Sequence, residues 1–167
     1  MAYYVYLISS LPGLHFGMKP PFSFEGFIER CRGFIPEAGL EMLKNASGLN
    51  QWQTFDKELR NELVKLRAAR KHKDPVQYLR RDGYVEPNII HIATSAIRNT
   101  SILEAEKILD QARWQALDEL SVGHYFDIDI LLIYSQKLLI LERWERIRRA
   151  NKQELLKTAL SADKELA

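Results

Sequence analysis

The chain has 167 residues, of which 46% are hydrophobic and 28% charged, so it can form one domain with a substantial hydrophobic core. Its formal net charge of +2 argues against a polyelectrolyte tail and against an obligate nucleic-acid binder. The single cysteine, Cys31, excludes a disulfide-rich secreted scaffold.

The first 31 residues contain two predicted elements. Residues 3–8 are β-branched and aromatic, a composition that fits either a short strand or a first helix, and both interpretations stay open. A loop that includes the prolines at 20–21 follows, because proline removes backbone donors. Ser23 is expected to cap a helix whose apolar side chains recur at helical spacing: Phe24, Phe27, Ile28 and Cys31.

Three helices are predicted in the next segment. Pro36 is expected as the first residue of a helix that stops near Gly48. A long amphipathic helix should then run from Asn50 to about His72, because an apolar residue recurs every three to four positions: Trp52, Phe55, Leu59, Leu63 and Leu66. A proline after an aspartate predicts a short helix over residues 75–82.

Two further helices follow with clearer start signals. Pro87 is expected to open a helix whose inward side chains are Ile89, Ile90, Ala93, Ala96 and Ile97. Ser101 and Glu104 have the spacing of a capping box, in which each side chain bonds the backbone amide of the other residue. The helix that they open should end near Gly123.

The last predicted helix is capped by Asp127 and is apolar nearly all round in its first turns, so it should lie at the centre of the core. Beyond Trp144 it becomes charged, and residues 145–167 are expected to leave the body as an exposed helical tail or to dock on another protein. Residues 1–167 therefore form one all-α domain, a helical bundle with a long C-terminal helix.

Membrane insertion and secretion are not expected. The longest apolar run, residues 128–141, is broken by polar residues and is shorter than the roughly 20 residues that span a bilayer. The first ten residues lack a basic leader. We therefore expect a cytoplasmic protein.

Residue patterns that would indicate catalysis are missing from the sequence. It contains neither a P-loop nor a dinucleotide-binding fingerprint. Cys31 lies on an apolar helix face, where a thiol is usually inert. His124, Asp127 and Asp129 could hold a divalent metal or take part in an unrecognised catalytic site, but helix capping by Asp127 explains them better. We expect no enzyme activity, no cofactor, no metal and no small-molecule substrate.

The middle of the chain is its basic part, with ten basic and six acidic residues in positions 51–100. The basic segment 67–73 contains Arg67, Arg70, Lys71 and Lys73, and Arg80 and Arg81 follow it. Cations at the end of a long helix are favoured by the helix dipole and stay hydrated, so a solvated helix end is the first interpretation. An acidic protein partner and contacts with nucleic-acid phosphates are the alternatives.

Short motifs near both ends of the chain carry a family resemblance: Tyr3-Tyr4, Ser10-Leu11-Pro12, Pro20-Pro21-Phe22-Ser23, Phe27, Leu103-Glu104-Ala105-Glu106, Arg113-Trp114, Leu117-Asp118-Glu119-Leu120, Gly123-His124-Tyr125-Phe126-Asp127 and Leu141-Glu142-Arg143-Trp144. With these motifs the chain resembles an uncharacterised bacterial family. Members of that family are small proteins encoded within V-type (V/A-type) ATPase operons of groups such as Bacteroidetes, spirochaetes and chlamydiae. The resemblance spans nearly the whole chain, and the middle matches by helical character alone.

The resemblance implies a non-catalytic accessory, stalk or assembly subunit of a V-type ATPase, related to the C (d) subunit, the all-helical socket between rotor and membrane ring. Such a protein would contact ATPase subunits and lie peripherally at the inner membrane through them. We expect the partner-binding face on the last helix, at Trp144, Arg148 and Arg149, where apolar residues give way to charged ones. A nucleic-acid-binding helical adaptor that uses segment 67–73 is the alternative.

Overall fold

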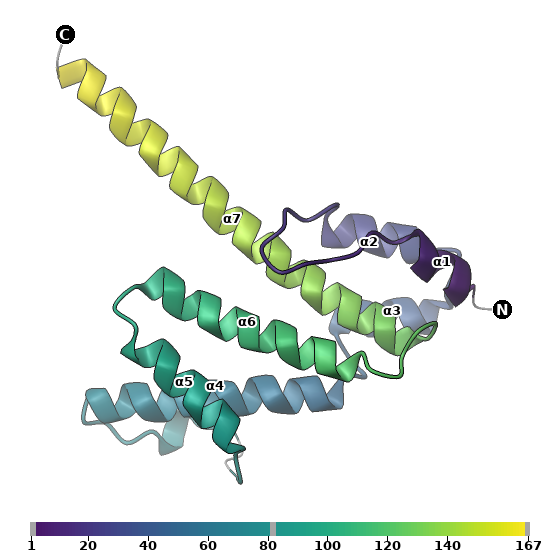
Figure 1. The fold of residues 1–167 in the computed structure, drawn as a ribbon, viewed down its shortest axis with the longest axis horizontal. Helices are drawn as coiled ribbons and strands as arrows, with labels where there is room; N and C mark the ends of the chain where they lie inside the picture. Colours follow the sequence, from purple (N-terminus) through teal and green to yellow (C-terminus); the bar gives the residue numbers. More distant parts are fainter. Residues whose placement is uncertain (1–2, 81–82, 166–167) are drawn as a thin grey trace.

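The computed structural model describes residues 3–80 and 83–165, and within them it contains α-helices, one short 3-10 helix and no β-strand element. The all-α prediction is confirmed (Figure 1). The elements in chain order are α1 (Tyr4–Ser10), α2 (Phe24–Cys31), α3 (Glu37–Asn45), α4 (Asn50–Arg70), the 3-10 helix η1 (Val76–Tyr78), α5 (Pro87–Arg98), α6 (Ile102–Leu120) and α7 (Ile128–Glu165).

The N-terminal segment is a helix, which decides between the two interpretations of residues 3–8. Helix α1 inserts the almost fully buried Leu7 into the core, while the Tyr3 amide donates to the carbonyl of Phe34 at 2.9 Å. A strand here would find no partner strand among the described residues, whereas a helix pairs its backbone groups internally.

The first part of α7 forms the centre of the larger core. Its buried side chains point to all sides of the helix and contact α2, α3 and α6: Leu131, Leu132, Ile133, Leu138 and Leu141. The loop of residues 11–23 lies across α7 (Figure 1), where the hydroxyl of Tyr134 donates to the carbonyl of Pro12 at 3.0 Å. The apolar run is therefore explained by the fold, because most faces of this helix segment are covered and Leu139 is its one exposed residue.

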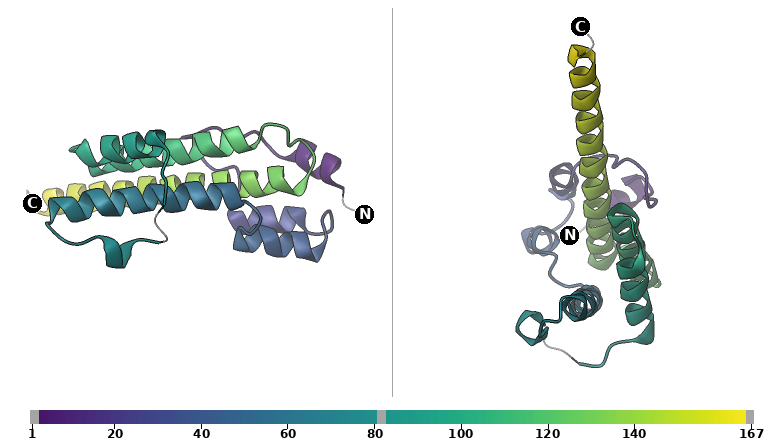
Figure 2. Two further views of the ribbon diagram at one scale, coloured as in Figure 1. Left: turned by 90° about the horizontal axis from the view of Figure 1, so that it is seen from below. Right: turned by 90° about the vertical axis from the view of Figure 1, so that its left-hand side faces the viewer.

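A second, smaller core lies between α4, α5 and α6, and α6 takes part in both cores. Its buried side chains are Leu59, Leu63, Ile89, Ala93, Ala96 and Leu109. The loop after α4 is held by Asn61, which exchanges two hydrogen bonds of 2.9 and 3.0 Å with the backbone of Arg80. Figure 2 shows these helices beside the base of α7, whose C-terminal half projects beyond them.

Several helix-start predictions are confirmed. The hydroxyl of Ser23 accepts from the amide of Gly26 at 3.1 Å, and Oδ1 of Asp127 accepts from the amide of Ile130 at 3.0 Å. Pro87 is the first residue of α5. The first turn of a helix leaves backbone amides without a partner within the helix. The Ser23 and Asp127 side chains each accept a hydrogen bond from one such amide, and Pro87 has no amide hydrogen at this position.

Four predictions need correction. The capping box is half formed: the Ser101 hydroxyl accepts from the Glu104 amide, but the Ser101 amide donates to Asn99 instead of to Glu104. Pro36 is the residue before α3 and not its first residue. Ile90 was expected inward and is 44% exposed. The short helix covers three residues, since Leu79 is already extended, and Arg81 and Asp82 lie outside the described residues.

The connection between α3 and α4 yields a stability prediction. Gly48 has φ +117°, and an added Cβ would come within 2.9 Å of the Met42 side chain and 3.1 Å of Leu132 in α7. Gly48→Ala should therefore lower the free energy of unfolding by about 1–3 kcal/mol, measured by urea denaturation. The matched control is Gly13→Ala, where nothing lies within 4 Å and φ is not positive. Equal stability of the two variants would contradict this interpretation.

Candidate functional site

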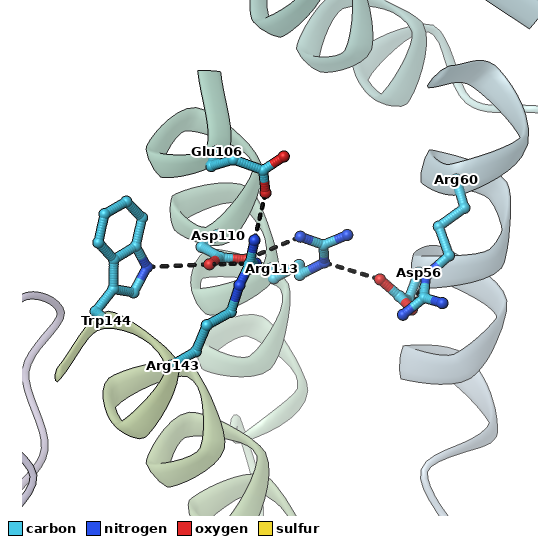
Figure 3. A network of polar contacts seen from close by, with 7 residues as sticks. All are labelled: Asp56, Arg60, Glu106, Asp110, Arg113, Arg143 and Trp144. Carbon is cyan, nitrogen blue, oxygen red and sulfur yellow. Dashed lines mark hydrogen bonds and ion pairs between the residues drawn. The ribbon is translucent and has the colours of Figure 1, made fainter. Parts of the chain in front are cut away.

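A charged network joins α4, α6 and α7 at the middle of the molecule (Figure 3). Glu106, Asp110 and Arg113 are spaced four and three residues apart on α6, so they share one face of that helix. Arg143 and Trp144 reach them from α7, and Asp56 reaches them from α4. Three helices that are distant in sequence therefore meet through side chains rather than through apolar packing alone.

Asp110 is the centre of this network, and its side chain is only 2% exposed. It accepts hydrogen bonds from Arg113 Nη1 at 2.8 Å, from Arg143 Nη1 at 2.8 Å and from the indole Nε1 of Trp144 at 3.0 Å. Arg143 also pairs with Glu106. A buried carboxylate without donors would be costly, and these three donors offset the cost of burying Asp110.

Arg113 links this centre to α4. Its Nε donates to Asp56 at 2.8 Å, while Asp56 also pairs with Arg60 at 2.8 Å. Burial by itself would lower the pKa of Arg113, but hydrogen bonds and charge attraction from Asp56 and Asp110 raise the pKa above its usual value. Arg113 therefore stays charged between two carboxylates and holds α4 and α6 at a fixed distance.

A groove of about 570 Å³ runs beside the network, between α4 and α7 with α6 as its floor. Its lining combines arginines and carboxylates with apolar side chains: Trp52, Asp56, Arg60, Leu63, Arg67, Glu106, Leu109, Asp110, Arg113, Gln136, Leu139, Ile140 and Arg143. Because the lining comes from three helices, this groove exists only in the folded chain.

The three residues expected to bind a partner have different surroundings. Trp144 is partly buried in the larger core and packs edge-on against Phe16. Arg148 donates to the carbonyls of Gly17 and Met18 at 3.1 and 3.2 Å, which fixes the loop of residues 11–23 on α7. Arg149 is the exposed member, with a side chain that is 68% exposed and paired with Glu145. Trp144 and Arg148 thus make contacts within the chain.

The basic segment is the solvated end of α4. Arg67, Lys71 and Lys73 are exposed, and among the described residues none of them forms an ion pair. Arg70 donates to the carbonyl of Ile97, so it joins the ends of α4 and α5. The segment therefore offers three unneutralised cations and one structural arginine.

His124, Asp127 and Asp129 lie together at the start of α7, with one potential ligand atom from each residue within 4.8 Å of the others. Nδ1 of His124 lies 2.6 Å from Oδ2 of Asp127 and 3.5 Å from Oδ2 of Asp129. His124 therefore gives Asp129, a carboxylate on an apolar helix, a partner of opposite charge when the imidazole is protonated. An adjoining hollow of about 410 Å³ is lined in its described part by no serine, threonine, cysteine or lysine. The cluster thus closes the turn that precedes α7.

Cys31 and Tyr134 are two further titratable side chains of the larger core. Burial raises the pKa of each to about 12. Cys31 is fully buried, so its thiol stays protonated and enclosed, in agreement with its position on the apolar face of α2.

Sequence reasoning missed the network around Asp110. The i, i+4 and i+7 spacing of Glu106, Asp110 and Arg113 was a usable signal that α6 carries one polar stripe through an otherwise apolar face. Nothing in the sequence links that stripe to Arg143 or Asp56, because those pairs are 33 to 57 residues apart and depend on how the helices pack.

Comparison with known proteins finds that part of the chain is similar to a family. Residues 92–162 match a family model described as a protein of unknown function (DUF2764). The match begins within α5 and takes in all of α6 and most of α7, the two helices that carry Asp110, Arg143 and Trp144. No curated protein and no solved structure matches the chain. In the described residues no helix is long and apolar enough to cross a membrane.

The network predicts a large cost for removing its central charge. Asp110→Asn keeps the side-chain shape but leaves two arginines facing an uncharged, partly donating amide, so the free energy of unfolding should fall by about 2–4 kcal/mol. Urea denaturation measures this loss. Glu119→Gln, on an exposed position of the same helix, removes an equal charge and should change stability by less than about 0.5 kcal/mol. Wild-type stability in Asp110→Asn would show that the network does not hold the helices together.

The cluster at the start of α7 predicts a pH dependence. The hydrogen bond with Asp127 raises the pKa of His124 above its usual 6.5, so the stability that this contact contributes is fully present below pH 6.5 and is lost as pH rises through the raised value. Burial raises the pKa of Asp127, but the hydrogen bonds from His124 and from the Ile130 amide lower it by more, so the pKa lies below its usual value of 3.8. The stability that ionised Asp127 contributes is therefore lost only in acid, as the pH falls below 3.8.

The measurement compares the unfolding free energy of the wild type and of His124→Gln between about pH 5 and pH 9, a range that brackets the ordinary histidine titration. The advantage of the wild type should be largest at the acidic end of that range and should decline with rising pH. The control repeats the comparison in an Asp127→Asn background, where the pH-dependent difference should shrink. A difference that stays constant with pH would rule out the ion pair as its source.

Proposed function

We propose that the chain is a non-catalytic accessory, stalk or assembly subunit of a bacterial V-type ATPase, which acts through helix–helix contacts with other subunits. The observation that supports this most directly is the course of α7. One unbroken helix of 38 residues, about 57 Å long at 1.5 Å per residue, begins in the centre of the core and ends beyond the body (Figure 1).

The anchoring of α7 suits a part that transmits or resists force. Its first turns are enclosed by apolar side chains, and its next turns are fixed by Arg143 to α6 and by Arg148 to the loop of residues 11–23. From Arg149 to Glu154 the side chains are exposed. A helix that is rigid at its root and exposed beyond it can present a surface to another helix without bending.

The resemblance described above provides the ATPase context for the proposal, and the family match provides no activity of its own. A nucleic-acid-binding adaptor is the second candidate, supported by the exposed Arg67, Lys71 and Lys73. Its surface is small and offers no exposed aromatic side chain among those positions for base stacking, so it would contact phosphates alone.

Co-purification tests the proposal. Affinity purification of the tagged full-length protein from its native host should recover V-type ATPase subunits. A stop codon in place of Asn151 removes the exposed part of α7 and should abolish this recovery, while circular dichroism should still report a folded helical body.

The control for that experiment is Lys107→Glu, which alters an exposed residue of α6 and should leave recovery unchanged. If the full-length protein brings down no ATPase subunit, the proposal fails. If the shortened chain recovers the subunits as well as the wild type does, the exposed part of α7 is not the contact.

A further inference from the structure

The groove between α4 and α7 has two straight walls of helical side chains. On α4 the lining residues follow one another at intervals of three or four positions from Trp52 to Arg67, so they form a single stripe. On α7 the residues from Gln136 to Arg143 form a second stripe in the same way. A surface with this geometry resembles the space between two helices of a bundle that lacks a neighbour.

The floor and walls of the groove expose apolar surface between charges. Leu139 of α7 is 38% exposed, and it lies in the lining with the largely buried Leu63 and Ile140. Arg60 and Arg67 stand on the α4 wall, and Arg143 stands on the α7 wall. Leu139 thus forms a small apolar strip, flanked on both sides by arginines, that is available to a partner.

Unpaired positive charge lies where the groove reaches the C-terminal end of α4. The three carboxylates of the lining, Asp56, Glu106 and Asp110, are each already paired with at least one arginine. Arg67 has no ion pair among the described residues, and Lys71 follows it one turn further along α4 with none either. The cations left over would attract negative charge, and the carboxylates would not compete for it.

We propose that this groove is a docking site for one acidic amphipathic helix of a partner protein. The apolar face of that helix would cover Leu139, and its carboxylates would pair with Arg67 and Lys71. The α4 wall spans 16 residues, about 22 Å, so the partner helix would be about four turns long. The inference rests on the helix-to-helix mode of action proposed above, but the identity of the assembly does not enter it.

A nucleic acid fits the same surface less well. The aromatic side chain in the lining, Trp52, is only 8% exposed, so it cannot stack on a base. The exposed leucine also has no role in phosphate binding. The observations therefore favour the acidic helix.

Fluorescence anisotropy on the full-length protein tests the proposal. The probe is a labelled peptide of about 15 residues, with leucines on one helical face and glutamates on both flanks, measured at about 0.15 M salt so that weak surface attraction is screened. A second peptide carries lysine in place of each glutamate. A single-stranded DNA of similar length is the third probe. We expect saturable binding of the glutamate peptide alone.

Two groove variants and one matched control locate the binding. Arg67→Glu reverses an unpaired cation, and it should weaken binding of the glutamate peptide about fivefold or more. Leu139→Asp places a charge on the apolar strip and should weaken it at least as much. Lys107→Glu makes the same change of charge outside the groove, and it should leave binding within about twofold of the wild type. Circular dichroism confirms that each variant is folded.

Each other outcome overturns the inference. Equal binding of the lysine peptide would mean that charge complementarity plays no part, and equal loss in Arg67→Glu and Lys107→Glu would mean that the groove plays none. Tighter binding of the DNA that is lost in Arg67→Glu would assign the surface to nucleic acid. If the glutamate peptide does not bind, the docking site is ruled out but the ATPase proposal still depends on co-purification. If co-purification fails, the ATPase proposal is ruled out but the peptide result still stands.

Discussion

The buried carboxylate of Asp110 is the constraint on which the arrangement of the helices depends. A charge with 2% exposure is tolerable only where donors surround it, and here they come from α6 itself and from two consecutive residues of α7, Arg143 and Trp144. Apolar packing would allow α7 to slide or rotate on α6 at modest cost. Three directed hydrogen bonds to one carboxylate select a single register.

That register determines how the two cores are joined. Helix α6 contributes to both of them, and Arg113 extends the connection from Asp110 to Asp56 on α4. The same contacts set the separation of α4 and α7 and therefore create the groove between them. The same helix contacts therefore form both the charged network and the candidate docking surface. Arginines neutralise the interior carboxylates, and the remaining cations lie at the edge of the groove.

Helix α7 has two physical environments along its length. Its beginning is closed by the His124 and Asp127 pair and enclosed by apolar side chains, whereas the residues from Arg149 to Glu154 are exposed. The loop of residues 11–23 stabilises the boundary between these two parts of α7, because Arg148 donates to two carbonyls of the loop. The amide of Phe24, which directly follows the loop, donates to Glu142 of α7. This construction gives a projecting helix a firm base, which is the feature that the proposed role in an assembly requires.

The sequence by itself determined the helices and most of their ends, because helical periodicity and caps such as Ser23 and Asp127 are local properties of a few adjacent residues. It also identified the apolar first half of α7 as the core helix. It left residues 3–8 open, since their side chains suit either structure and only the absence of a neighbouring strand in the described residues decides for a helix. The groove and the partners of Asp110 were decided by the tertiary structure alone, because a contact between residues 33 positions apart depends on the packing of whole helices and leaves no periodic signal in the chain.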